Sequence, residues 1–416
     1  MLRRNFLKAS GLGLAGVALA PQLALASADD DDPPNLAADA IPITVEERQA
    51  RVARAAALMR AHEIDAVLVE AGSSLVYFTG VQWWRSERLT AAILTREGEI
   101  AVVTPFFEEP SVRETLALPA EVLTWHEDER PTRLLGAWLE KRGLAKGRIG
   151  IEETVRFFAV DGLRQALPDA SIIDGSPVVR GCRMVKSPAE IALMQTANDV
   201  TLAAYRHVVP KIEKGMSNRE IGAMINAATR QLGGTPEFAL VLLGEASAYP
   251  HGTNSPQEVR DGEVVLMDVG CNVHGYQSDI SRTFVHGGAD VRQRTVWKQM
   301  RRAQQVAFDT AANGLPAGEV DAAIRRYLEG LGYGPRYKLP GTSHRTGHGI
   351  GLDGHEPVNL VLGETAPLAP GMCFSNEPGI YLPGEFGIRL EDCFHMTTDG
   401  PRWFTEPPRT MDDILA

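Results

Sequence analysis

The chain has 416 residues, of which 44% are hydrophobic and 23% are charged, and its formal net charge at pH 7 is −11. This composition is typical of a soluble globular protein, and the length favours two folded domains over a single core. The acidic balance gives non-specific nucleic-acid binding no electrostatic support, so nucleic acid is not an expected partner.

Residues 1–28 resemble an export signal of the twin-arginine type. Arg3 and Arg4 precede an apolar run over residues 9–25, and small residues follow at the spacing of a cleavage site. A basic region, a hydrophobic region and a cleavage site in this order are typical of a secretory signal. An ordinary membrane helix is disfavoured because Gly residues and Pro21 interrupt the run. We therefore expect a periplasmic protein without stable membrane insertion once the signal is removed.

An α/β domain is predicted over residues 43–178. It follows a predicted linker at 29–42, where four consecutive aspartates and two prolines carry no apolar pattern. Short apolar runs then alternate with amphipathic segments, which is typical of an α/β domain. The pattern predicts helices over 45–62 and 157–167, and strands over 66–69, 91–95, 100–104 and 149–152.

A second domain is predicted over residues 187–416, after a boundary at 175–187. Ser187 as N-cap, Pro188 at the first helical position and Glu190 in a capping box predict the start of a long helix. Further helices are expected after Ser217 and over about 296–313 and 319–331.

The cysteines are expected to be buried thiols rather than disulfides. None of their spacings forms a metal-binding pair such as Cys-x-x-Cys, and three of them lie in segments assigned to the core of the second domain. They are Cys182, Cys271, Cys373 and Cys393.

Two predicted hairpins each present a pair of carboxylates. Asp268 ends an apolar strand, and a turn at 273–274 would place it directly opposite Asp279, with Cβ atoms roughly 5 Å apart. A second turn, centred on Gly384, would place Glu377 opposite Glu391. Like charges at this distance are unfavourable unless a proton or a metal lies between them. Both hairpins therefore point to a metal site.

An imidazole is expected from the segment 344–355, in which Gly347 and Gly349 allow a ligand or a neighbouring strand to approach the backbone of His348 closely. Four carboxylates with one or two histidines form a hard, oxygen-rich donor set, which suits Mn²⁺, or Co²⁺ or Zn²⁺, more than a thiolate-loving metal. Bridging carboxylates would hold two such cations about 3.5–4 Å apart. Two divalent cations are thus the expected cofactors. His274 lies in the predicted first turn and is expected at the surface.

Residues 187–410 resemble the metallopeptidase family with the pita-bread fold, which includes prolidase, aminopeptidase P and methionine aminopeptidase. The segment 76–80 resembles the creatinase/prolidase N-terminal domain, which methionine aminopeptidases lack. The resemblance therefore implies an α/β (α+β) fold with a creatinase/prolidase-like N-terminal domain and a pita-bread catalytic domain. The matching catalytic segments are the Asp268 and Asp279 pair before Arg282-Thr283, residues 347–349, Glu377-Pro378-Gly379 and residues 389–392.

The resemblance also implies roles for individual residues, a homodimer and a substrate class. The substrates would be di- or oligopeptides that contain proline. Histidines lining the substrate site would be His251, His344 and His355. The five metal ligands would be Asp268, Asp279, His348, Glu377 and Glu391.

The expected reaction is hydrolysis of the bond that precedes proline, by a hydroxide shared between the two cations. Glu377 would carry the proton towards the leaving nitrogen, and His344 and His355 would donate hydrogen bonds to the developing oxyanion or to substrate, with His251 beside them. Arg389 and Tyr381 are candidate substrate-binding residues. Alternatively, Arg389 neutralises the site and orients carboxylates, and Tyr381 only packs.

Three alternatives remain open. A metal-free creatinase-like hydrolase and a non-catalytic binding protein share the fold, although the complete ligand set disfavours both. Residues 357–376 contain no arginine to hold a substrate carboxylate, so either Arg345 or an arginine of the N-terminal domain does so, or longer peptides are accepted. We favour an Xaa-Pro dipeptidase over an Xaa-Pro aminopeptidase.

Trp83 and Trp84 are expected in the core or at a dimer contact, and Asp353 is expected to be a loop charge.

Overall fold

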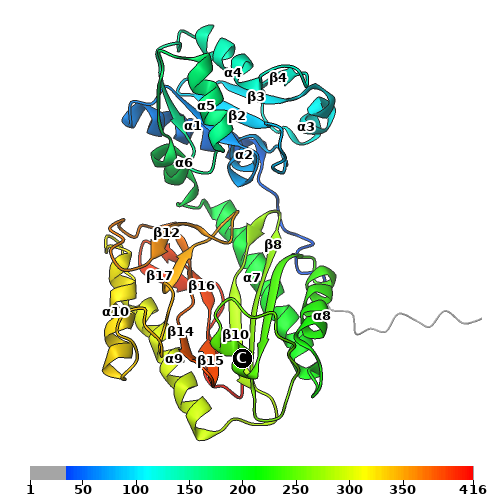
Figure 1. Ribbon diagram of the computed structural model, residues 1–416, viewed down its shortest axis with the longest axis vertical. Coiled ribbons are helices and arrows are strands. Elements are labelled where there is room, and N and C mark those ends of the chain that lie inside the picture. The colour runs from blue at the N-terminus through cyan, green and yellow to red at the C-terminus, as the bar shows by residue number, and fades with distance from the viewer. Residues whose placement is uncertain (1–33, 416) are drawn as a thin grey trace, which may run out of the picture. The chain divides into compact units, whose positions relative to one another are not determined.

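The computed structural model describes residues 34–415, which form a mixed α/β structure (Figure 1). The export signal predicted for residues 1–28 lies outside the described residues, as does most of the first half of the predicted linker. Within the described range, no helix combines the length and the apolar character needed to cross a membrane.

The N-terminal part is built on a six-stranded sheet with strand order β4-β3-β2-β1-β5-β6. The strands are β1 (Ala66–Glu70), β2 (Ala91–Thr95), β3 (Ile100–Pro105), β4 (Glu121–Trp125), β5 (Arg148–Ile151) and β6 (Ser171–Asp174). The helices are α1 (Val45–Ala61), α2 (Ser73–Thr79), α3 (Glu109–Thr115), α4 (Pro131–Glu140), α5 (Phe157–Ala166) and α6 (Ser176–Arg183).

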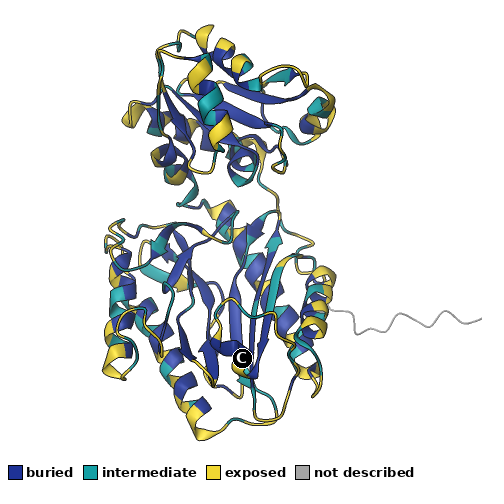
Figure 2. Ribbon diagram, in the orientation of Figure 1, coloured by how far each residue is buried: buried dark blue, intermediate teal, exposed yellow. Residues whose placement is uncertain are grey.

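Helices cover both faces of this sheet, which explains why β1, β2 and β3 are buried along their whole length. Alternate residues of a strand point to opposite faces. Val67 and Val69 of β1 therefore join the core formed with α1, α2 and α6, whereas Ala66 and Leu68 join the core formed with α4 and α5. Figure 2 shows these strands as a buried layer.

The predicted helix at 45–62 is confirmed as α1, and the strands predicted at 91–95 and 100–104 are confirmed as β2 and β3, which pair antiparallel. Sequence periodicity missed β4, whose first four residues are exposed or half-buried and lack a clear apolar alternation. The segment 175–187, predicted as a boundary, contains helix α6.

The C-terminal part places its strands between two pairs of helices, α7 with α8 and α9 with α10 (Figure 1). The helices are α7 (Pro188–Val208), α8 (Asn218–Gln231), α9 (Val291–Thr310) and α10 (Gly318–Gly330). Short 3₁₀ helices in the described chain are Phe106–Glu108, Val209–Lys211 and Gly244–Ala248. The predicted capping box at Ser187 is confirmed, and the helix expected after Ser217 begins with a capping box as well. Helix α9 begins earlier than predicted because Asp290 caps it, its side chain accepting from the backbone N–H of Gln293.

Three sheets make up the scaffold of the C-terminal part. One has the order β10-β8-β7, with β9 paired to β8; another has the order β12-β11-β13-β16-β17; β14 and β15 form a two-stranded sheet. Their bounds are β7 (Thr235–Leu243), β8 (Val264–Val273), β9 (Tyr276–Gln277), β10 (Ile280–Val285), β11 (Gly347–Gly349), β12 (Glu356–Leu360), β13 (Cys373–Asn376), β14 (Gly379–Leu382), β15 (Phe386–Arg389), β16 (Asp392–Thr397) and β17 (Gly400–Trp403). The cysteines in the described chain are buried and free, as predicted.

The predicted register of the first hairpin was wrong by two residues. The turn consists of His274 and Gly275, both with left-handed backbone (φ 49° and 88°), so Asp268 pairs with Ser281 and not with Asp279. Two consecutive residues with positive φ make a tight two-residue turn that matches the twist of the strands. His274 is exposed, as expected. Because side chains alternate along a strand, a shift of two keeps both carboxylates on the same face.

The predicted register of the second hairpin is confirmed. Gly379 pairs with Arg389 in the β14–β15 ladder, and Asn376 pairs with Asp392 where β13 meets β16. Glu377 and Glu391 lie in the interruption between these two ladders. Glu391 instead forms a β-bridge with Ser281 of the first hairpin. This bridge brings the two carboxylate-bearing hairpins together.

Candidate active site

A pocket of about 670 Å³ lies where the hairpins and β11 meet. Asp279, His348 and Glu391 each point one ligand atom into it, and these three atoms lie within 4.8 Å of one another. All three side chains are buried. The other residues predicted for the site that line the pocket are His251, Asp268, His344, His355, Glu377 and Arg389.

The orientation of His348 leaves it facing carboxylates. Its Nδ1 lies 3.0 Å from the carbonyl oxygen of Gly349, and a carbonyl can only accept, so Nδ1 carries the proton. A neutral ring then presents the lone pair of Nε2 to Glu377 Oε1 at 3.2 Å and to Asp279 Oδ2 at 3.8 Å. Acceptors this close require a proton or a cation between them.

Three carboxylate oxygens in the pocket wall are buried without any hydrogen-bond partner among the described residues: Asp268 Oδ1, Asp279 Oδ1 and Glu391 Oε1. Burial, and then the charges of Asp268 and Glu377, raise the pKa of Asp279 well above its usual range. Burial, and then the charge of Asp279, likewise raise the pKa of Glu391. Unpaired buried carboxylates are costly. An oxygen-rich set with one imidazole fits divalent cations, which would remove this cost.

The guanidinium of Arg389 is fully used in hydrogen bonds to residues of the site. Its Nη2 donates to Asp268 Oδ2 at 2.6 Å, and its Nε donates to Ser281 Oγ at 3.0 Å. Its Nη1 donates to the carbonyl of Pro250 at 3.0 Å and to the hydroxyl of Tyr381 at 3.3 Å. These contacts favour the alternative role, in which Arg389 neutralises and orients carboxylates.

The His344 ring is held at both nitrogens. Nδ1 lies 2.8 Å from the carbonyl oxygen of Arg345 and must be the donor, so Nε2 accepts from the Tyr381 hydroxyl at 2.8 Å. Burial lowers the pKa of His344. In this arrangement neither ring nitrogen is free to donate to a substrate, and Tyr381 is part of the network rather than a packing residue alone.

His355 and His251 occupy different surroundings. His355 packs edge-on against His348, with ring centroids 4.1 Å apart. Burial lowers the pKa of His355 to about 4, and the nearby guanidinium of Arg345 acts in the same direction, so its ring is neutral at pH 7. His251 is exposed at the pocket rim.

A buried ion pair on α10, which the sequence analysis did not single out, clamps the segment that carries His344. Asp321 and Arg325 pair at 2.9 Å, one helical turn apart. Asp321 accepts from Thr346 Oγ1 at 2.6 Å, and Arg325 donates to the backbone carbonyls of Thr342 and His344. The i,i+4 spacing of opposite charges was the signal in the sequence.

A second missed contact lies behind Glu391. Arg282 donates to the carbonyl of Glu391 at 3.0 Å and to Asp392 Oδ1 at 2.7 Å, and both Arg282 and Asp392 are buried. Arg282 belongs to the matching segment that follows the Asp268 and Asp279 pair, but the sequence did not show that its side chain would bind the backbone of Glu391.

The fold and the site together define a metallopeptidase with a pita-bread catalytic part and an N-terminal α/β part. Comparison with known proteins agrees. The profile of metallopeptidase family M24 matches residues 192–398, and that of the creatinase/prolidase N-terminal domain matches residues 51–185. The chain belongs to metallopeptidase family M24.

Named relatives cover most of the chain. The Xaa-Pro dipeptidase of Lactobacillus helveticus is 31% identical over 346 residues, which are 82% of this chain and 92% of that protein. The crystal structure of dipeptidase PepE from Mycobacterium ulcerans matches with a TM-score of 0.82 at 30% identity, over 89% of this chain and 98% of that one. A dipeptidase structure from Pyrococcus horikoshii matches with a TM-score of 0.77 at 30% identity, over 86% and 99%.

Proposed function

We propose that this metallopeptidase is an Xaa-Pro dipeptidase that uses two divalent cations, with Mn²⁺ as the first candidate. The observation that carries the proposal is the convergence of four carboxylates and one imidazole, three of whose oxygens are buried without partners. The residues that would hold the cations are Asp268, Asp279, His348, Glu377 and Glu391. Bound there, the cations would supply Lewis acidity that activates water and polarises the scissile carbonyl.

The chain's own residues would do the remaining work. Glu377 lies at the pocket wall, where its carboxylate would accept a proton from the attacking water and pass it to the prolyl nitrogen. The neutral ring of His355 would donate a hydrogen bond to the developing oxyanion. His344 and Tyr381 would hold Arg389, and through it Asp268, in place. Proline lacks an N–H and restricts the residue before it, so a pocket of fitting shape selects it.

Arg345 supports dipeptidase over aminopeptidase activity. It lines the pocket and is half-buried, yet its side chain makes no hydrogen bond or ion pair with any residue of 34–415. Arg389, by contrast, is fully engaged. A free guanidinium binds a carboxylate strongly and in a defined geometry. The C-terminal carboxylate of a dipeptide lies one residue from the cleaved bond and would be its ligand.

One observation favours the aminopeptidase alternative. Arg345 and His355 also line an adjoining hollow of about 350 Å³. A longer peptide could extend into it.

The first test is turnover of Ala-Pro and of a longer Xaa-Pro-Xaa peptide by the purified protein, metal-free and with Mn²⁺. Mn²⁺-dependent cleavage that Asp279→Ala abolishes is the expected result, with Ala-Pro preferred. Preference for the longer peptide would instead indicate an aminopeptidase. Cleavage without metal would point to a creatinase-like hydrolase. No cleavage with metal bound would point to a binding protein and refute the proposal.

The second test separates the role of Arg345 from catalysis. Ala-Pro and Ala-Pro-amide differ only in the terminal carboxylate. Arg345→Met is expected to raise KM for Ala-Pro by about 10- to 100-fold, the value of a hydrogen bond to a charged group, and to leave the amide nearly unchanged. Arg345→Lys should restore part of the loss. Equal losses on both substrates would contradict a carboxylate-binding role.

We also propose that the protein is exported to the periplasm and forms a homodimer, as residues 1–28 and the family resemblance suggest. Trp83 packs partly against the N-terminal core, whereas Trp84 is 89% exposed and available for a contact. Cell fractionation of the tagged full chain tests export, and the parent is expected in the periplasm. A variant in which Lys replaces both Arg3 and Arg4 is expected to stay in the cytoplasm. Sedimentation of the parent and Trp84→Ala tests the dimer, and a monomeric parent would refute it.

A further inference from the structure

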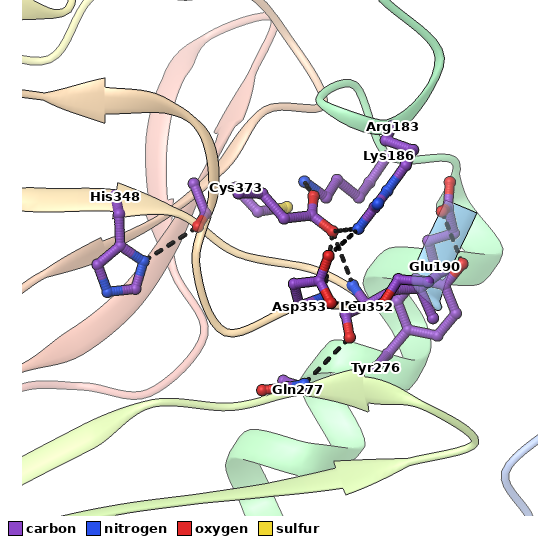
Figure 3. Close-up of polar contacts among 12 residues, drawn as sticks. Arg183, Lys186, Glu190, Tyr276, Gln277, His348, Leu352, Asp353 and Cys373 are labelled. Atoms are coloured by element: carbon purple, nitrogen blue, oxygen red, sulfur yellow. Dashed lines mark hydrogen bonds and ion pairs between the residues drawn. The ribbon is translucent and has the colours of Figure 1, made fainter. Parts of the chain in front are cut away.

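A buried ion-pair cluster holds the loop that leads to His355 (Figure 3). At its centre is the carboxylate of Glu356, which is buried and accepts from Lys186 Nζ at 2.9 Å and from Arg183 Nη2 at 2.5 Å. The same carboxylate accepts from the backbone N–H groups of Leu352 at 3.0 Å and Asp353 at 3.2 Å. Glu356 thus binds the backbone of the loop that precedes it and links this loop to the side chains of Arg183 and Lys186.

The N-terminal part of the chain reaches this loop directly. Arg183 ends helix α6, and its Nη2 also donates to Asp353 Oδ2 at 2.7 Å. Ser73 begins helix α2, and its hydroxyl donates to the other oxygen of Asp353. Both helices lie in the region that matches the creatinase/prolidase N-terminal domain. The expectation that Asp353 is only a loop charge was therefore wrong, because its partners come from a distant part of the sequence.

The opposite side of the loop is held by the first hairpin. The backbone N–H of Gln277 in β9 donates to the carbonyl of Gly351 at 2.8 Å, and the side-chain amide of Gln277 donates to the carbonyl of Leu352 at 3.0 Å. A Cβ on Gly351 would lie 2.9 Å from the oxygens of Glu356 and 2.8 Å from Lys186 Cε, so a larger residue at position 351 would displace this ion pair. The loop is gripped from both sides, and His355 is the residue that immediately precedes Glu356.

We propose that Arg183 is a positioning residue: through Glu356 and Asp353 it orders loop 351–355 and so fixes the ring of His355 over the reacting bond. The N-terminal part would then take part in catalysis without touching substrate. The inference rests on the role proposed above for His355. Since Lys186 still pairs with Glu356 when Arg183 is removed, the expected consequence is a loosened loop in a folded protein.

Arg183→Met is compared with Arg180→Met, a matched control on the same helix whose partner, Glu153, is exposed. Amide hydrogen exchange at Leu352 and Asp353 reports the loop itself, because these two N–H groups donate to Glu356. Faster exchange is expected in Arg183→Met and not in the control. A small misplacement of a catalytic group can cost up to about 100-fold, so kcat is expected to fall by about 10- to 100-fold with little change in KM. Arg183→Lys should recover part of kcat.

A double-mutant cycle tests whether the effect passes through His355. Loss of one oxyanion donor typically costs about 100- to 1000-fold, which leaves turnover of His355→Ala measurable. In that background Arg183→Met is expected to cost less than about 2-fold, because the group that it positions is gone. If Arg183→Met does not fold, Asp353→Asn replaces it in the cycle, with a smaller loss expected, since it removes only one partner of Arg183.

Several results would overturn the inference. Unchanged exchange at Leu352 and Asp353 would show that Arg183 does not order the loop. An equal fold-loss with and without His355 would show a general structural effect, and full activity of His355→Ala would show that its position is irrelevant. A parent enzyme that cleaves no Xaa-Pro peptide would refute the proposed function instead, and the exchange measurement would still decide whether Arg183 orders the loop.

Discussion

Asp279→Asn is expected to remove most of the stabilisation that Mn²⁺ gives to the folded protein. The Asp279 carboxylate is buried, faces His348 and Glu391, and has one oxygen without a partner in the described part of the chain. A ligand that binds only the folded state, supplied at 100 times its Kd, adds about 2.7 kcal/mol. For a domain of about 200 residues this corresponds to a rise in Tm of about 5–10 °C.

Thermal denaturation of chelator-treated protein, with and without Mn²⁺, measures this shift. In the metal-free state, Asp279→Asn should leave Tm unchanged or raise it, because it removes a buried carboxylate that is costly to ionise. Asp261→Asn is the control: Asp261 is exposed and pairs with Lys214 at 2.7 Å, so this variant should keep the whole Mn²⁺ shift. A full shift in Asp279→Asn would refute the reasoning that this carboxylate binds the metal.

Three further predictions follow from buried groups. Burial alone would raise the pKa of the Glu356 carboxyl, but the neighbouring cations of Arg183 and Lys186 lower this pKa to about 2. The ionised carboxylate therefore stabilises the folded state by about 3 kcal/mol above pH 4.5, and this contribution is lost as the pH falls towards 2. In denaturant unfolding, the parent should therefore have a higher free energy of unfolding than Glu356→Gln at pH 5, and this difference should be mostly lost at pH 2.5. Asp321→Asn should lower the free energy of unfolding, measured by urea denaturation, by about 3–5 kcal/mol, because it leaves Arg325 buried without its ion-pair partner. It should also lower kcat. Finally, the buried cysteines should react with a thiol reagent only after denaturation; reaction in the native state would contradict their burial.

The sequence predicted local features of the site better than its assembly. The turn at Gly384 was placed correctly, and the paired register of β14 and β15 followed from it. The turn of the first hairpin was misplaced because His274 adopts a left-handed conformation that is uncommon for a residue other than glycine. The error did not affect the chemistry, since Asp268 and Asp279 share a face in either register.

Contacts between distant segments could not be predicted in this way. The bridge between Ser281 and Glu391 joins the two hairpins, yet neither residue carries a pattern that names its partner. The same holds for Arg183 and Asp353, which are 170 positions apart. Local periodicity determines which face a side chain occupies, whereas such pairings depend on how whole elements pack.

The charge balance of the pocket explains why its groups require cations and how substrate binding depends on them. Asp268 is neutralised by Arg389, but Asp279, Glu377 and Glu391 have no such partner among the guanidinium and ammonium groups that line the pocket. Burial lowers the pKa of both His344 and His355, so these two rings do not supply positive charge. Without divalent cations this negative field would also repel the carboxylate of a dipeptide from Arg345. Metal binding and carboxylate binding should therefore be linked, so that each strengthens the other.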